Sequence, residues 1–182
     1  MIKTKHGWIL GLILISVLAL VPGILRGEEA RYTNPTYGIS FPILEDIILY
    51  TPEHPGPFTF EKDNIFIVIN KWKPNELIML NRSAVADEVD LDYLKSQMEE
   101  QGLPQPGYHK VSVGYTNIGE HQRKRAVDHI FNLQGKVPRT MRYVVFVQKG
   151  QGLTFVCTSD TDRFRETNKD FFEPFLRSIK FE

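Results

Sequence analysis

The sequence predicts an α+β fold, a predominantly antiparallel sheet with helices packed on it. Residues 144–147 and 153–157 are apolar at successive positions and rich in β-branched and aromatic side chains, which is typical of strands covered on both faces. A Gly-Gln-Gly sequence at 150–152 joins the two runs tightly, and hairpins produce antiparallel sheets. Four apolar residues then recur at helical spacing and predict a helix lying across this sheet: Phe164, Phe171, Phe175 and Ile179.

The length and composition of the chain are those of one globular domain preceded by a short segment. The chain has 182 residues, of which 42% are hydrophobic and 24% are charged, which is enough to bury a substantial core. We expect residues 1–27 to be a signal peptide or N-terminal membrane anchor and residues 28–182 to form a single domain.

The first 27 residues have the layout of an export signal. A basic start, residues 1–6, precedes an apolar run that begins at Trp8, ends at Leu25 and is interrupted by Pro22. There is no A-x-A cleavage site, and the 18 residues of this run are just long enough to span a bilayer. We therefore expect an extracytoplasmic protein, which is either secreted or periplasmic after cleavage or anchored to the outer face of the cytoplasmic membrane through residues 8–25.

Charge and cysteine content exclude several functional classes. Three of the 22 basic residues lie in residues 1–27, which have no acidic residue, so the body carries 19 basic and 22 acidic residues. A body with net charge −3 argues against nucleic-acid binding, which needs a broad basic face. The single cysteine, Cys157, excludes a disulfide framework and a cysteine-based zinc site, and its apolar setting predicts a buried, unreactive thiol.

The first half of the body predicts short strands joined by turns. Asn34-Pro35 favours a turn between the first two, and Pro74 is expected to end the strand at residues 65–72. The pattern over residues 75–88 is ambiguous and is best described as a loop with a helical turn. The expected strand regions up to residue 74 are the two halves of 31–42, then 47–50, 58–60 and 65–72.

The second half predicts two helices separated by strands. Asp90 is placed to cap a helix whose apolar face comprises Leu91, Leu94 and Met98. Two further strands are expected at about 110–116 and 122–134. In all, the pattern predicts about seven strands, mostly joined as hairpins, and two main helices, which suggests a layered sandwich.

The last helix has two local features. Ser159 is expected to cap its start, with Asp160 and Asp162 as alternative caps. Pro174 is expected to kink the helix or break it nearby, because proline lacks the amide hydrogen that the helix needs.

Two stretches resemble the PsbP-like proteins, the relatives of the extrinsic photosystem II subunit, together with the DcrB-like bacterial exported proteins. The motif YxNPxYGISFP at residues 32–42 resembles their opening hairpin. The motif LTF at 153–155, followed by Phe171, Phe175 and LRSIKF at 176–181, resembles their last strand, helix and closing strand. The family often has a tryptophan soon after the first Phe-Pro, and the residues that follow Pro42 here, ILED, contain none.

The resemblance covers roughly residues 31–182 and rests on structural residues. It implies an α/β/α sandwich and a non-enzymatic protein that docks on a protein partner without a cofactor. Because a fold hosts many functions, it does not imply a photosystem role.

Residues that could bind a metal ion are few. His121 and His129 lie eight residues apart on one expected strand, roughly 26 Å, and cannot share an ion. His109 could face Asp128 or His129 across the hairpin, which leaves open a metal-dependent protein or enzyme using the His109 and His129 region. Zinc normally needs three or four ligands, and the sequence shows no clear third.

No set of residues supports catalysis. None of the serines lies in a G-x-S-x-G sequence, and Gly150-Gln151-Gly152 lacks both the third glycine and the following helix of a phosphate loop. The adjacent acidic pairs, Glu28-Glu29 and Glu99-Glu100, do not predict the shared cleft that acid–base catalysis requires. We therefore expect no enzyme.

One polar cluster is a candidate binding site. Residues 121–125 place cations beside a hairpin turn of an otherwise acidic body. Such runs are often only solvated strand ends, and the functional alternative is a docking patch for an acidic partner or anionic lipid headgroups. Alternation along a strand predicts that Arg123 and Arg125 face one way and Lys124 the other. The candidate binding residues are His121, Arg123, Lys124 and Arg125.

Overall fold

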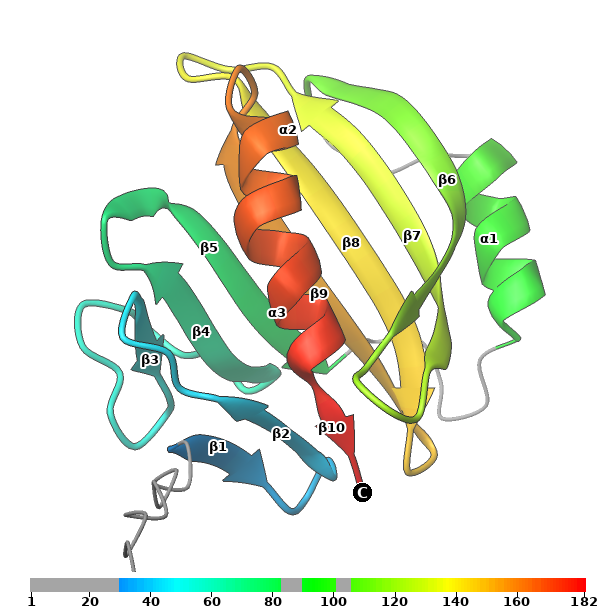
Figure 1. Cartoon of the computed structure of the whole chain (residues 1–182). Helices are drawn as coiled ribbons and strands as arrows, with labels where there is room; N and C mark the ends of the chain where they lie inside the picture. Colours follow the sequence, from blue (N-terminus) through cyan, green and yellow to red (C-terminus); the bar gives the residue numbers. More distant parts are fainter. Residues whose placement is uncertain (1–29, 83–89, 101–105) are drawn as a thin grey trace, which may run out of the picture.

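The computed structural model describes residues 30–82, 90–100 and 106–182, and its largest feature is a seven-stranded antiparallel sheet (Figure 1). Every neighbouring pair in this sheet is antiparallel. In spatial order its strands are β3 (Ile47–Tyr50), β4 (Asn64–Asn70), β5 (Lys73–Arg82), β9 (Gln151–Asp160), β8 (Arg139–Gln148), β7 (Lys124–Leu133) and β6 (Tyr108–Ile118).

A small second sheet brings the start and the end of the described chain together. Its order is β1 (Arg31–Asn34), β2 (Ile39–Pro42) and β10 (Lys180–Phe181), all antiparallel. The turn between β1 and β2 forms as the Asn34-Pro35 signal predicts, because the Asn34 side chain accepts a hydrogen bond from the backbone N–H of Tyr37 at 3.3 Å.

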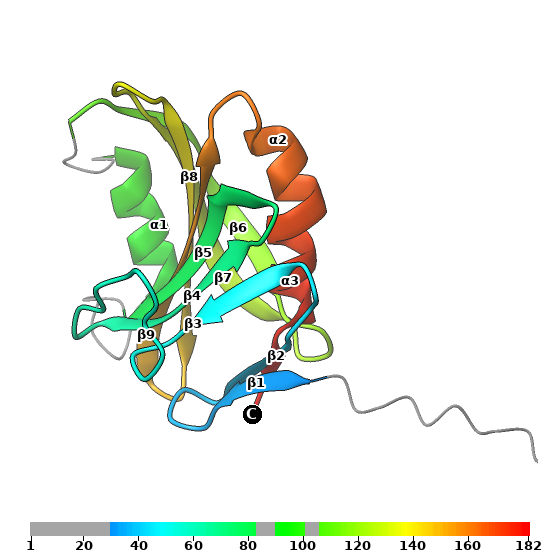
Figure 2. The ribbon, with the colours of Figure 1, turned by 90° about the vertical axis from the view of Figure 1, so that its left-hand side faces the viewer.

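Helices cover both faces of the large sheet. Helix α1 (Leu91–Glu100) packs on β6 and β7, and a longer helical segment lies across the opposite face (Figures 1 and 2). This segment consists of α2 (Phe164–Thr167), a π-helical turn η1 (Asn168–Phe172) and α3 (Glu173–Ser178). None of the described helices is long and apolar enough to cross a membrane. The predicted fold class, antiparallel strands with helices packed on them, is confirmed.

The main core lies between the long helical segment and the two sheets. Phe172, Phe155 and Phe146 are fully buried there, and Phe41 from β2 completes the layer with a ring 4.9 Å from that of Phe175. A smaller cluster on the other face joins Met98 of α1 to the sheet. Asp90 caps α1 as predicted, because its carboxylate accepts the backbone N–H groups of residues 92 and 93 at 2.9 and 3.3 Å.

The predicted hairpin of β8 and β9 forms, and its turn is shorter than predicted. Gln148 pairs with Gln151, so the turn residues are Lys149 and Gly150, with φ values of 50° and 71°. Two successive positive φ values match the right-handed twist of the flanking strands, which is the usual geometry of a two-residue hairpin loop.

Three predictions in the first half of the chain are wrong. Residues 58–60 form no strand, and residues 75–82 belong to β5 instead of a loop with a helical turn. The described chain has ten strands in all, where about seven are predicted. Pro74 does not end the hairpin because it lies in an irregular stretch: Asn70 pairs with Lys73 and Ile69 with Leu77, which leaves Pro74 without a paired position. Residues 83–88 lie outside the described residues.

The last helix begins without the predicted cap. The N-cap residue of α2 is Arg163, whose side chain makes no capping hydrogen bond, and the Ser159 hydroxyl donates instead to the backbone oxygen of Asp160. Asp160 supplies its backbone oxygen, not its carboxylate, to the N–H of Arg163 at 3.1 Å. The expected irregularity near Pro174 is present as the π-helical turn η1, which ends two residues before it.

Candidate functional site

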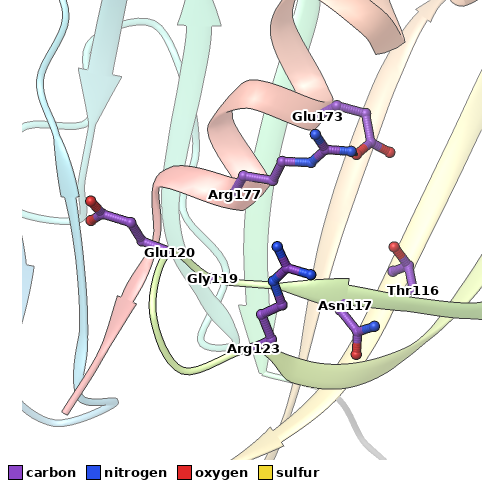
Figure 3. A pocket seen from close by; sticks show the side chains of 7 residues that line it. All are labelled: Thr116, Asn117, Gly119, Glu120, Arg123, Glu173 and Arg177. Atoms are coloured by element: carbon purple, nitrogen blue, oxygen red, sulfur yellow. The ribbon is translucent and has the colours of Figure 1, made fainter.

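A polar cleft of about 480 Å³ lies between the turn that joins β6 to β7 and helix α3 (Figure 3). Its walls come from residues far apart in the sequence, and the basic cluster at 121–125 supplies one of them. The lining residues are Thr116, Asn117, Gly119, Glu120, Arg123, Glu173 and Arg177.

The turn is fixed to the end of α3 by two backbone hydrogen bonds. The N–H of Gly119 donates to the oxygen of Leu176 at 2.9 Å, and the N–H of Glu120 donates to that of Ile179 at 2.8 Å. These bonds satisfy carbonyl groups at a helix end that have no partner within the helix. Gly119 has φ +97°, and a Cβ atom there would lie 2.8 Å from the Phe181 ring. The wall of the cleft is therefore held in place by backbone contacts.

Behind the cleft lies a buried arginine, Arg142, which is only 2% exposed. Its Nε and Nη2 donate to the two oxygens of Asp128 at 2.9 and 2.7 Å. Its Nη1 donates to Asn168 at 2.8 Å and to the carboxylate of Glu173. Burial alone would lower the pKa of Arg142, but the hydrogen bonds and the negative charge of Asp128, with help from Glu173, raise it above its usual range. The guanidinium is therefore permanently charged.

The buried arginine changes the charge balance of the cleft. One carboxylate oxygen of Glu173 accepts a hydrogen bond from Arg142, and the other forms an ion pair with Arg177 at 3.3 Å. Arg142 is shared between Asp128 and Glu173, so the charges of Arg142 and Arg177 balance those of the two carboxylates. Arg177 is exposed and keeps free N–H donors, but it adds no surplus charge to the cleft. Glu120 is likewise paired, with Lys180 at 3.5 Å.

Arg123 supplies the second cation of the cleft. Its side chain points from the turn toward α3 and Arg177 (Figure 3), and it forms no ion pair with another described residue. Two guanidinium groups beside the polar side chains of Thr116 and Asn117 form a donor-rich pocket. Planar guanidinium donors match the geometry of carboxylate and phosphate groups, so the arrangement can bind an oxyanion.

The structure separates the four predicted binding residues. His121 is exposed beside Glu120, at 3.5 Å, and does not line the cleft. Lys124 is half-buried, donates to the backbone oxygen of Val147 at 3.2 Å, and has its pKa lowered by burial. Arg125 forms an ion pair with Asp92 of α1 at 2.8 Å, on the other face of the sheet. Of the four, only Arg123 lines the cleft.

The predicted orientation of Arg123 and Arg125 is wrong, because the alternation of a strand holds only from Lys124 onward. Strand β7 begins at Lys124, and Arg123 lies in the preceding turn, where alternation does not hold. The cleft residues that the sequence did not indicate are Arg177 and Glu173. Their spacing of four residues predicts a pair on one helix face, but nothing in the sequence predicts that the 119–123 turn lies beside it.

The predicted pairing around His109 is also wrong. His109 pairs with Asn132, while Val113 is opposite His129 and Gly114 is opposite Asp128. His129 is fully buried and bonds to the hydroxyl of Tyr108 through Nε2 at 2.9 Å. Burial, with the nearby charge of Lys110, lowers its pKa against the opposing effect of Asp128. Among the described residues, no group of three or more His, Cys, Asp or Glu side chains is arranged to hold a metal ion.

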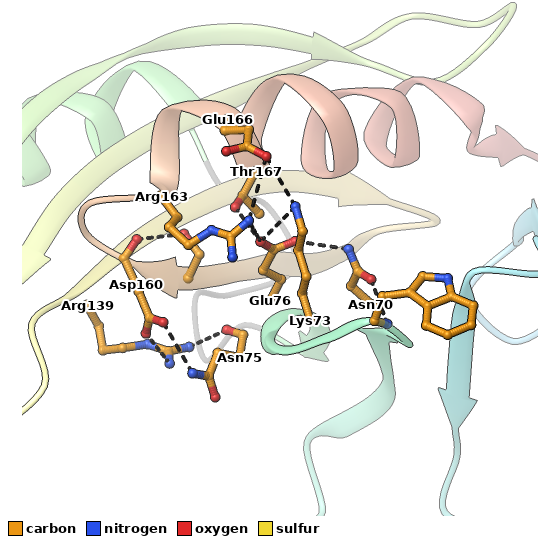
Figure 4. Close-up of polar contacts among 11 residues, drawn as sticks. Asn70, Lys73, Asn75, Glu76, Arg139, Asp160, Arg163, Glu166 and Thr167 are labelled. Atoms are coloured by element: carbon orange, nitrogen blue, oxygen red, sulfur yellow. Dashed lines mark hydrogen bonds and ion pairs between the residues drawn. The ribbon is translucent and has the colours of Figure 1, made fainter.

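A second polar cluster joins the β4–β5 turn to the start of α2 (Figure 4). Its centre is Glu76, which is 3% exposed and accepts hydrogen bonds from Thr167 at 2.8 Å and Asn70 at 3.0 Å. Lys73 and Arg163 lie 3.7 and 3.8 Å from the same carboxylate. Since each group has a partner within the cluster, this network fixes the helix on the sheet and leaves little for a ligand.

The fold has known counterparts, although no family model matches the sequence and no curated protein is similar to it. The solution structure of cyanobacterial PsbP (CyanoP) from Synechocystis sp. PCC 6803 has a TM-score of 0.56 and 15% identity, over 84% of this chain and 92% of that one. The crystal structure of LpqN, which is involved in cell envelope biogenesis of Mycobacterium tuberculosis, has a TM-score of 0.52 and 13% identity, over 83% of this chain and 88% of that one. Together with the motifs at 32–42 and 153–181, these matches identify the fold of this chain as PsbP-like.

Proposed function

We propose that this chain is an exported, non-catalytic binding module that docks on an acidic segment of a protein partner at or near the membrane. The cleft between the β6–β7 turn and α3 is the proposed docking site. Export is supported by the signal-like residues 1–27. The description of LpqN as a protein of cell envelope biogenesis is consistent with a role outside the cytoplasm.

The observation that carries the proposal is the pair Arg123 and Arg177. Arg123 has no ion-pair partner among the described residues, and the side chain of Arg177 is 73% exposed and contacts only one oxygen of Glu173, which leaves most of its N–H donors free. Both project into a cleft whose walls are joined by backbone hydrogen bonds. Because the backbone of both walls is fixed, a carboxylate of the partner can be bound without rearrangement of the chain, and the binding cost is limited to ordering the two arginine side chains.

The proposed contact is solvent-exposed, so its energy should be modest and sensitive to salt. Exposed ion pairs typically contribute about 0.2 to 1 kcal/mol each, and added salt screens them. Their main effect should be on the rate of association and on the choice of partner.

The test uses a short peptide rich in glutamate as the probe, titrated into the full chain in detergent and followed by NMR or calorimetry. The double substitution R123E/R177E should abolish binding at low ionic strength and leave the melting temperature nearly unchanged. The matched control is K62E/K136E, which makes the same change of charge at two exposed sites, one in the β3–β4 connection and one in the β7–β8 turn. Equal binding by R123E/R177E and K62E/K136E would mean that the cleft is only a solvated surface.

The alternative function, a metal-dependent protein or enzyme using the His109 and His129 region, gains no support from the geometry. Nε2 of His129 is hydrogen-bonded to the Tyr108 hydroxyl, and His109 lies opposite Asn132. We therefore advance no second candidate.

A further inference from the structure

The edge of the large sheet at β3 carries a group of exposed apolar side chains, which we call the edge patch. Soluble proteins rarely expose several large apolar side chains together without a use for them. The patch consists of Ile43, Leu44, Ile48 and Trp72, which are 39%, 44%, 37% and 74% exposed.

The members of the edge patch belong to separate segments that backbone hydrogen bonds join. The N–H of Lys71, which precedes Trp72, donates to the oxygen of Asp46 at 2.8 Å, two residues after Leu44. The N–H of Ile43 donates to the oxygen of Ala30 at 2.6 Å. The segments that carry the exposed residues therefore lie along one edge of the sheet, and β3 at that edge faces the viewer in Figure 2.

The edge patch also adjoins the place where the N-terminal segment joins the body. Ala30 is the first described residue and is bonded to Ile43. Only residues 26–29 separate it from the apolar run that ends at Leu25. Five residue steps span at most about 18 Å, so a membrane that held residues 8–25 would lie close to this edge.

We infer that the edge patch rests on the surface of the lipid bilayer in which residues 8–25 are anchored. The inference rests on the proposed location at the membrane, and it adds an orientation: the β3 edge faces the lipid. The β6–β7 turn and its cleft lie toward the opposite edge of the sheet, so they would face a partner away from the bilayer (Figure 1).

The chemistry of the patch suits the boundary between headgroups and acyl chains. Tryptophan is enriched at that depth because its ring is apolar and its N–H can still bond to polar groups. The backbone at Trp72 is fixed by a hydrogen bond from its N–H to the side-chain oxygen of Asn70 at 3.0 Å. The ammonium of Lys71 lies 5.3 Å from the centre of its ring and can extend toward headgroups while its stem stays on the apolar surface.

The charges around the patch include no surplus of cations, which separates this contact from the docking cleft. Glu45 and Asp46 follow Leu44, Lys71 precedes Trp72, and Lys73 is already paired with Glu76 and Glu166. Because the patch has no surplus of cations, the contact should depend on apolar burial, form on uncharged lipids, and resist salt. Binding in the Arg123 cleft should instead be screened by salt.

The test places a reporter on the edge patch of the full chain in phosphatidylcholine vesicles. Selective labelling is feasible because Cys157 is the only cysteine and is fully buried, and burial raises the pKa of its thiol to about 12. An environment-sensitive dye is attached to Leu44→Cys or Trp72→Cys. The control is Tyr93→Cys, an exposed site on α1 on the far side of the sheet.

When vesicles are present, we expect the emission of the dyes at positions 44 and 72 to shift to the blue. Their quenching by iodide should fall several-fold. Lipids with a spin label near the headgroup should quench them, high salt should not reverse these effects, and the dye at position 93 should behave as in solution. A second variant carries the dye at Ile48→Cys with L44S/W72S. It should still float with the vesicles but regain access to iodide.

Equal quenching at positions 44, 72 and 93, in protein that floats with the vesicles, would overturn the orientation while leaving the anchor in place. Loss of shielding at high salt would refute the apolar contact. Failure of the full chain to float with vesicles would remove the anchor and the orientation together. The docking proposal is tested by a different measurement, the binding of the acidic peptide to the unchanged protein and to R123E/R177E. Its failure can therefore be distinguished from failure of the proposed orientation.

Discussion

Phe175 lies where α3 meets both sheets, and its replacement by alanine tests the packing of the whole layer. The side chain is 7% exposed, and its ring centre lies 4.9 Å from that of Phe41, 6.2 Å from that of Phe155 and 6.5 Å from that of Phe66. Those three rings come from β2, β9 and β4, which backbone bonding fixes on all sides. The cavity left by Phe175→Ala therefore cannot close by local movement.

The expected loss is about 4 kcal/mol in the free energy of unfolding, within the range of about 3 to 5 for a buried phenylalanine replaced by alanine. At about 2 to 4 °C per kcal/mol for a domain of this size, the melting temperature should fall by about 8 to 16 °C. Urea titration measures the free energy, and an unchanged slope with urea concentration shows that the unfolded states remain comparable.

The matched control is Phe164→Ala, the same substitution at the start of the same helical segment. Phe164 is half-buried and contacts one ring, that of Phe172, at 6.2 Å. Its loss should be less than half of that at Phe175. Similar losses at the two positions, or an unchanged melting temperature for Phe175→Ala, would show that α3 does not seal the core between the two sheets.

Three further predictions concern acid stability, the cleft wall and export. The folded protein disfavours charged His129, because burial lowers its pKa below the usual value of 6.5, so stability should fall as the pH drops below about 6.5. His129→Phe should remove that part of the slope in urea titrations across this pH range, and an unchanged slope would mean that other groups cause it. Gly119→Ala should cost about 1 to 3 kcal/mol and weaken binding of the acidic peptide, because φ is +97° and the new methyl group would lie 2.8 Å from the Phe181 ring. A Gly114→Ala control, where no atom lies within 4 Å of the new carbon, should do neither. Protein from the native host should be found outside the cytoplasm, and its intact mass decides between cleavage and anchoring; full-length protein in the soluble cytoplasm would contradict export.

Much of the fold could be predicted from local pattern. Strands β8 and β9 follow from two apolar runs, and the last helix follows from the spacing of Phe171 and Phe175. Both patterns identify buried positions, because apolar residue types mark the side chains that a fold buries. The pattern does not predict β5, because proline has no N–H to donate and in most sequences marks the end of a strand. Only the pairing of Asn70 with Lys73 reveals the bulge that accommodates it, and such pairing is a property of two strands together.

The cleft could be predicted only in part, because it depends on contacts between distant segments. Arg123 stood out as a cation in an acidic body, but so did Lys124 and Arg125, which the structure assigns to other contacts. What distinguishes Arg123 is the position of its turn against α3, set by the hydrogen bond from Gly119 to Leu176. No spacing in the sequence encodes that contact.

The π-helical turn before Pro174 links the fold to the charge of the cleft. Asn168 and Glu173 are five residues apart, and in an α-helix they would point about 140° away from each other. In a π turn, residues five apart lie one above the other, and the backbone N–H of Glu173 donates to the oxygen of Asn168 accordingly. Both side chains can therefore bond to the same nitrogen of Arg142. Because Arg142 takes one oxygen of Glu173, only the other oxygen is left for Arg177. The π turn is therefore what connects a residue that lines the exposed cleft, Glu173, to the buried Arg142 beneath it.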